Sequence, residues 1–201
     1  LIKRYKKTLA LERKLPKKSE LVEVFSNFYF GGDPEGDPQK WNGFINNEPL
    51  LVTPNFFKTL DNLEIAWGFV RGAEPPSAKF VLERRLSLKK PPLIAMGDAP
   101  DKPDPTGLLL LLQRISPGPL GEDNPPVAYL GDTVADVLTI KQARKEVPKQ
   151  KFISLAISPP HLQTKAKKHL RDDYENKLKE AGADHVISDI QDSLNIIKSW
   201  Q

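Results

Sequence analysis

The stretch that decides the fold is VAYLGDTVADV, residues 127–137. Four apolar residues run directly into Gly131 and Asp132, and a second carboxylate follows at Asp136. A short apolar run bounded by a turn signal is typical of a strand buried on both faces. We therefore predict a strand over 127–130 and a helix over 133–145, with two acids at the point where they join.

The rest of the chain repeats this alternation. Apolar runs of the same kind predict further buried strands at 65–70, 93–96, 152–157 and 185–188, and amphipathic segments predict helices at 76–85, 105–114 and 161–181. Thr53 followed by Pro54 predicts the start of another helix, with a capping hydroxyl and proline at the first helical position. A β-α-β-α order of this kind favours a parallel sheet flanked by helices, an α/β fold of the Rossmann-like class. The preceding part differs, with two helical segments and a Gly- and Pro-rich loop over 31–44, so we place a domain boundary between residues 48 and 49.

Composition limits the class of protein. The chain has 201 residues, 39% of them hydrophobic and 28% charged, which suits one folded core with a small appendage. Its longest uninterrupted apolar run, 108–112, is far too short to cross a membrane. The chain has no cysteine, which excludes disulfides and thiolate metal sites and fits a reducing compartment such as the cytoplasm or an organelle matrix.

The first 18 residues are strongly basic, with eight Lys and Arg against Glu12. A nucleic-acid patch is one explanation of this charge. A solvated helix face explains it better, because no aromatic platform for stacked bases accompanies the charges. We therefore do not expect nucleic acid as a partner.

Charged residues follow most of the predicted strands, where an open parallel sheet binds its ligands. They are Arg71, then Asp98, Asp101, Lys102 and Asp104, then Asp132 and Asp136. Such a rim suits a phosphate group together with a divalent cation, since carboxylate oxygens are ligands that Mg²⁺ accepts and a lysine neutralises phosphate.

Two interpretations of Asp132 and Asp136 remain open at this point. Asp132 could face a cation at the strand tip, and Asp136, one helical turn later, could hold a ligand or a water beside it. Alternatively, Asp132 and Thr133 only cap the helix, and Asp136 is a solvated helix acid.

The wider arrangement resembles the haloacid dehalogenase (HAD) superfamily. Two segments are similar to the third and fourth motifs of that superfamily: Lys102-Pro103-Asp104-Pro105 and the strand that ends in Gly131-Asp132-Thr133. About one helix and a loop separate them, as in the superfamily. The segments EPLLVTP (48–54), WGFVRGAEP (67–75), IAMGDAPDKPDPTG (94–107) and YLGDTVADV (129–137) look like a family of phosphatase-like HAD hydrolases, subfamily I, found in cyanobacteria and plastids. The resemblance extends from about Leu21 to the end of the chain.

This resemblance implies a HAD core over 49–201, part of a helical cap over 1–48, and Mg²⁺ with a small phosphorylated substrate in cytoplasm or plastid stroma. In the family, Asp132 would help coordinate Mg²⁺, Asp136 would support that site, and Lys102 would bridge phosphate and nucleophile. Residue 71 departs from the family, which has Ser or Thr there. We expect Arg71, Gly72 and Lys102 to bind the phosphate, with Arg71 as a clamp. Arg71 could instead fill the pocket and pair with Asp132, or it could be a surface arginine at a strand end.

The second departure is larger. The family's first motif, an apolar strand ending in DxDG that supplies the nucleophile, is missing from these 201 residues. In the HAD sheet that strand lies between the strands at 127–130 and 65–70, and its loss would leave two buried edges unpaired. We therefore expect the natural chain to begin before Leu1 and this chain alone to be inactive. The leading hypothesis is a magnesium-dependent phosphatase with an upstream nucleophile, and the alternative is an inactive HAD-like protein with a binding or assembly role.

Overall fold

A computed structural model describes residues 17–70 and 72–200 of the protein. The chain divides into two compact units, Leu1–Glu48 and Pro49–Gln201. The predicted helix at the basic N-terminus and the side chain of Arg71 lie outside the described residues. No helix within the described ranges is long and apolar enough to cross a bilayer.

The first unit is built on helix α2 (Lys18–Phe30). The helix ends at Gly31, whose φ of 64° lies in the left-handed region that glycine tolerates best. Two short 3-10 turns follow, η1 (Pro38–Lys40) and η2 (Phe44–Asn46). Phe30, Trp41 and Ile45 are buried, and the Trp41 ring packs against Phe30 at the helix end. The unit therefore has a small core at one end of α2.

The second unit contains two parallel sheets. Strands β3 (Val127–Gly131), β4 (Phe152–Ile157) and β5 (His185–Ile187) form a three-stranded sheet in that order. Strands β1 (Phe69–Val70) and β2 (Leu93–Ile94) form a separate two-stranded sheet. The α/β class with parallel strands is thus confirmed, although β1 and β2 are shorter than the sequence predicted.

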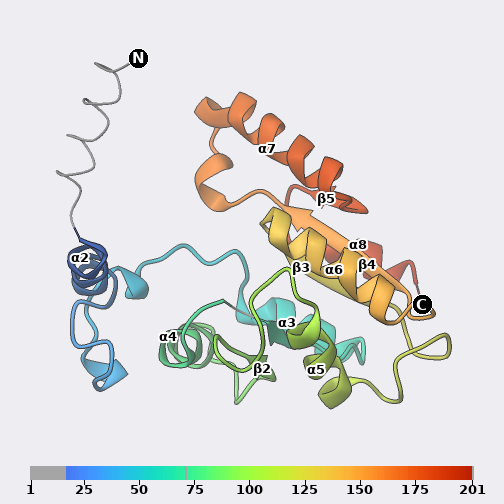
Figure 1. Ribbon diagram of the computed structural model, residues 1–201, viewed down its shortest axis with the longest axis horizontal. Helices are drawn as coiled ribbons and strands as arrows, with labels where there is room; N and C mark the ends of the chain where they lie inside the picture. Colours follow the sequence, from blue (N-terminus) through green and yellow to red (C-terminus); the bar gives the residue numbers. More distant parts are fainter. Residues whose placement is uncertain (1–16, 71, 201) are drawn as a thin grey trace, which may run out of the picture. The chain divides into compact units, whose positions relative to one another are not determined.

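Helices alternate with these strands along the chain. Figure 1 shows one of them, α6, in front of β3 and β4. Most agree with the sequence prediction, including α3, which begins at Pro54 after Thr53. The prediction of one helix over 161–181 is wrong: two 3-10 turns, η4 and η5, come first and α7 begins only at Lys168. The bounds of the helices are α3 (Pro54–Asn62), α4 (Pro75–Lys79) with a π-helical continuation η3 (Phe80–Arg85), α5 (Thr106–Ile115), α6 (Val134–Glu146), η4 (Pro160–Leu162), η5 (Lys165–Lys167), α7 (Lys168–Ala181) and α8 (Asp192–Lys198).

Two hydrophobic cores cover opposite faces of the strands. On one face α3 and α8 pack against Phe69 of β1 and Leu130 of β3. On the other face α5 and α6 pack against Val70 of β1 and against Val127 and Tyr129 of β3. Neighbouring residues of a strand point to opposite faces, so β1 and β3 each contribute to both cores. The two sheets therefore share their cores, although no pairing between described strands joins them.

The sequence predicted strands buried on both faces, and this is right only for β4, in which every residue is buried. Residues of β1 and most of β3 are half-buried. The reason is position: β4 has a strand on each side, whereas within the described residues β1 and β3 each have a neighbour on one side only.

Candidate functional site at the carboxyl end of β3

The turn between β3 and α6 has a fixed local geometry. Thr133 is the N-cap of α6, and its hydroxyl accepts a hydrogen bond from the amide of Asp136 at 3.2 Å. In return the Asp136 carboxylate accepts the Thr133 amide at 3.0 Å, which completes a capping box. Gly131 permits this close approach, since a Cβ there would lie 2.3 Å from the Cβ of Asp136.

Asp136 is the centre of a buried polar network. Lys102 donates to its Oδ1 at 2.6 Å, and the Tyr129 hydroxyl donates to the same oxygen at 3.2 Å. The Thr133 hydroxyl donates to Oδ2 at 2.6 Å, so together with the Thr133 amide the carboxylate accepts four hydrogen bonds. A carboxylate has about four lone-pair sites, so little capacity is left for a further ligand.

The charge state of Asp136 follows from these contacts. Asp136 is only 3% exposed, and burial opposes its ionisation. Hydrogen bonds from Lys102 and Thr133 outweigh burial and hold the pKa of Asp136 below its ordinary value. The alternative interpretation of Asp136 as a solvated helix acid is therefore wrong, because its carboxylate forms a buried ion pair.

Asp132 has a different environment. Its carboxylate makes no hydrogen bond or ion pair to another side chain within residues 17–70 and 72–200. Burial, and then the neighbouring charge of Asp136, raise the pKa of Asp132, while Lys102 and His161 act in the opposite direction. A half-buried carboxylate without a partner gains stability from a nearby cation.

The backbone of Asp132 is held from a distant part of the chain. Tyr174, in α7, donates its hydroxyl to the carbonyl oxygen of Asp132 at 2.8 Å. The ring of Tyr174 packs against the cluster of Val137, Ala156 and Leu178, which join α6, β4 and α7. The turn that carries Asp132 is thus attached to the core at a second place.

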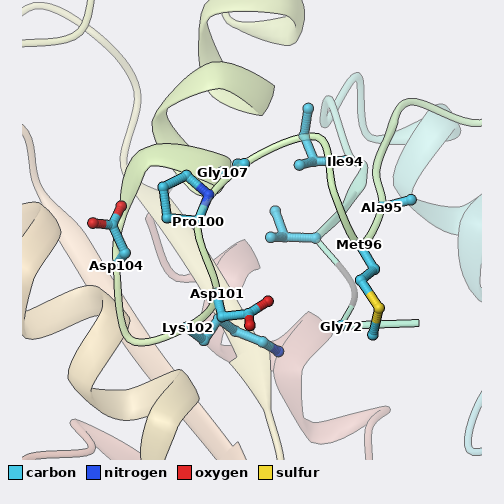
Figure 2. Close-up of a pocket in the computed structure, with 11 residues that line it drawn as sticks. Gly72, Ile94, Ala95, Met96, Pro100, Asp101, Lys102, Asp104 and Gly107 are labelled. Carbon is cyan, nitrogen blue, oxygen red and sulfur yellow. The ribbon is translucent and has the colours of Figure 1, made fainter. Parts of the chain in front are cut away.

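A shallow pocket of about 20 Å³ lies where the loop after β1 meets the loop after β2, and Gly72 and Lys102 are among the residues that line it. Figure 2 shows Lys102 and Asp101 with their side chains directed toward the side of the pocket on which Gly72 lies. A Cβ added at Gly72 would meet none of the described atoms within 4 Å, so the space beside its backbone is open. The loop after β1 and the loop after β2 therefore meet at the same edge.

The structure brings several of the predicted residues together. Lys102 contacts Asp136 directly and shares the pocket with Gly72, and Asp132 lies in the capping turn of Asp136. Within residues 17–70 and 72–200 no three His, Cys, Asp or Glu side chains gather as a ready metal site. Sequence reasoning missed Tyr129 and Tyr174, because a tyrosine within an apolar strand or a helix stripe gives no signal beyond packing.

Comparison with known proteins supports the fold. A scan against protein-family models finds no match, and a search of curated proteins finds none either. Among solved structures, the chain is similar to a phosphonoacetaldehyde hydrolase-like protein from Oleispira antarctica, with a TM-score of 0.64 and 14% sequence identity. The match covers 95% of this chain and 68% of that chain. The protein therefore shares the α/β fold of that structure, with parallel strands between layers of helices.

Proposed function

We propose that the protein is a HAD-type hydrolase, a magnesium-dependent phosphatase that acts on a small phosphate ester through an aspartate preceding Leu1. One observation carries this proposal: Lys102, Asp132 and Asp136 lie at the carboxyl end of β3, and within residues 17–70 and 72–200 no strand pairs with the free edge of β3. In α/β folds this end of the sheet is the place where ligands bind.

The open edge has backbone groups ready for a strand. The amide of Val127 donates to the Lys151 carbonyl at 2.9 Å, on the β4 side. Because successive amides of a strand point to opposite sides, those of Ala128 and Leu130 point away from β4. The amide of Phe69 donates to Pro92, on the β2 side, so that of Val70 points away from β2 by the same rule. We propose that the missing strand runs between these two edges and ends beside Lys102.

Each residue of the site then has a role. Lys102, held by Asp136, would bind the phosphate and the nucleophilic carboxylate, and the open backbone at Gly72 would border the phosphate. Asp136 would act by fixing Lys102 and the turn, since its own oxygens are already occupied. Arg71 lies outside the described residues, and its role as a phosphate clamp remains a proposal.

The residues present fit a Mg²⁺ site in which Asp132 is the protein ligand and Asp136 holds the surrounding turn and Lys102 in place. Mg²⁺ is commonly held by one or two carboxylates, with water and substrate phosphate oxygens completing its shell. Asp132 offers such a carboxylate, half-buried and without a side-chain partner in the described part of the chain. When bound there, Mg²⁺ would neutralise charge on the phosphate during transfer.

The chemistry can be written as two displacements. The upstream aspartate would attack phosphorus and break its bond to the ester oxygen, which would leave with a proton from solvent. Water would then attack phosphorus of the acyl phosphate, which would return the carboxylate, release inorganic phosphate and give a proton back to solvent. Lys102 would stabilise charge on the phosphate oxygens in both steps. This chain without the aspartate would bind but not turn over.

The first unit supports the proposal as part of a cap. Five apolar residues of α2 are more than half exposed: Leu21, Val22, Val24, Phe25 and Phe28. An apolar face of this size on a helix usually packs against another element. We propose that the part of the cap preceding Leu1 covers this face.

The test is phosphate release by the natural protein, including whatever precedes Leu1, from a panel of small phosphate monoesters. We expect hydrolysis with Mg²⁺, its loss on addition of a chelator, and its recovery when Mg²⁺ is restored. The 201-residue chain is the matched control and should release no phosphate. Hydrolysis that survives chelation would contradict the proposal. A natural protein without the upstream aspartate and without activity would favour the alternative, a HAD-like binding or assembly protein.

A further inference from the structure

We infer that Tyr174 is a positioning residue for Asp132, which sets the affinity of the site for a divalent cation. This inference rests on the proposed function of Asp132 as a cation ligand. The observation behind it is a 2.8 Å hydrogen bond from the Tyr174 hydroxyl to the Asp132 carbonyl oxygen. The two residues are 42 positions apart in the sequence.

The two acids of the site are held in different ways. The carboxylate of Asp136 is fixed directly by Lys102, Tyr129 and Thr133. The carboxylate of Asp132 has no such side-chain partner within the described ranges, so its direction depends on the backbone that carries it. That backbone forms the bend between the last residue of β3 and the N-cap of α6.

Tyr174 is suited to fix this bend. Its ring is packed against Val137, Ala156 and Leu178, so its hydroxyl has a defined position. The same helix also reaches the end of β4, where Glu175 accepts a hydrogen bond from buried Ser158 at 2.7 Å. Helix α7 thus joins the carboxyl ends of β3 and β4 and holds Asp132 where a cation would bind. Residues that orient a metal ligand typically change metal affinity by about ten- to a hundredfold when they are replaced.

The experiment compares Tyr174→Phe with the unchanged protein and with Asn176→Ala, an exposed position in α7. Phenylalanine retains the packed ring and removes only the hydroxyl. Dissociation constants for Mg²⁺ would be measured by NMR titration of the 201-residue chain, and Mn²⁺ broadening of the amides of residues 131–133 would localise the bound ion. We expect Tyr174→Phe to weaken Mg²⁺ binding by about tenfold and Asn176→Ala to leave it unchanged.

Two further readouts separate positioning from a general loss of stability. Urea unfolding should give similar midpoints for Tyr174→Phe and Asn176→Ala, and the Asp132 and Thr133 amides should broaden through exchange in Tyr174→Phe alone. If Mg²⁺ binds at Asp132 with the same affinity in Tyr174→Phe and in the unchanged protein, the role of Tyr174 is refuted and the proposed function stands. If the unchanged protein binds no divalent cation near residues 131–133, the cation site fails, and the role of Tyr174 fails with it.

Discussion

Replacing Lys102 by methionine is expected to lower the free energy of unfolding by about 3 kcal/mol at pH 7. Methionine retains the length of the side chain and removes its charge. The side chain of Asp136 is 5% exposed, so the variant would leave a buried carboxylate without its ion pair. The expected loss is at the lower end for buried pairs, because Lys102 is 26% exposed and Asp136 keeps its bonds to Thr133.

A double-mutant cycle identifies the cause of this loss. The double variant Lys102→Met, Asp136→Asn should be more stable than the sum of the single effects predicts, because an amide needs no countercharge. Lys149→Met is the matched control: Lys149 pairs with Glu122 at 3.9 Å and both side chains are about 80% exposed. That control should change stability by less than about 0.5 kcal/mol. Equal losses in Lys102→Met and Lys149→Met, measured by urea unfolding, would show that the buried pair does not stabilise the fold.

Replacing Asp132 by asparagine is expected to lower activity strongly and to stabilise the protein. Burial and the charge of Asp136 raise the pKa of Asp132, so its ionised form is disfavoured in the folded state. Asparagine removes this charge at similar size, and the gain at pH 7 should be up to about 1 kcal/mol. In the natural protein the same change should lower phosphate release by about a hundredfold or more, because the cation loses its carboxylate.

The effect of Asp132→Asn on stability should depend on pH. Ionised Asp132 destabilises the folded protein fully above its raised pKa, and this destabilisation disappears as the pH falls toward the pKa of Asp132 in the unfolded chain, about 3.9. The stability difference between Asp132→Asn and the unchanged chain should therefore shrink between pH 7 and pH 4. Asp136 behaves oppositely, since its pKa is lowered: its stabilisation is present above about pH 3.9 and is lost below. If Asp132→Asn proves less stable at pH 7, Asp132 serves the fold and not a ligand.

Much of the fold could be predicted from local patterns. Strand β4 was predicted at its observed bounds, because FISLAI is continuous, apolar and buried at every residue. The start of α3 was predicted from Thr53-Pro54, since proline at the first helical position has the φ that a helix needs. Helix α8 was missed because its seven residues are too few to show a clear period.

The candidate site was predictable in its residue types and less so in its contacts. The GDxxxD spacing placed Asp132 and Asp136 at one strand end, and the Lys102 segment was identified through the family resemblance. The direct bond between Lys102 and Asp136 joins positions 34 residues apart. Such a contact depends on how the loop after β2 meets the first turn of α6, which no local pattern encodes. The tyrosine contacts depend on tertiary packing in the same way.

The measurement that tests the central proposal most directly is amide hydrogen exchange at the two open strand edges, in this chain and in the natural protein with its preceding residues. In this chain, the amides of Val70, Ala128 and Leu130 should exchange rapidly, while that of Tyr129, which points toward β4, should be protected. In the natural protein all four should be protected, because a strand ending in the nucleophilic aspartate would pair with both edges. Unchanged exchange at Val70, Ala128 and Leu130 in the natural protein would contradict the proposal that a further strand completes the sheet.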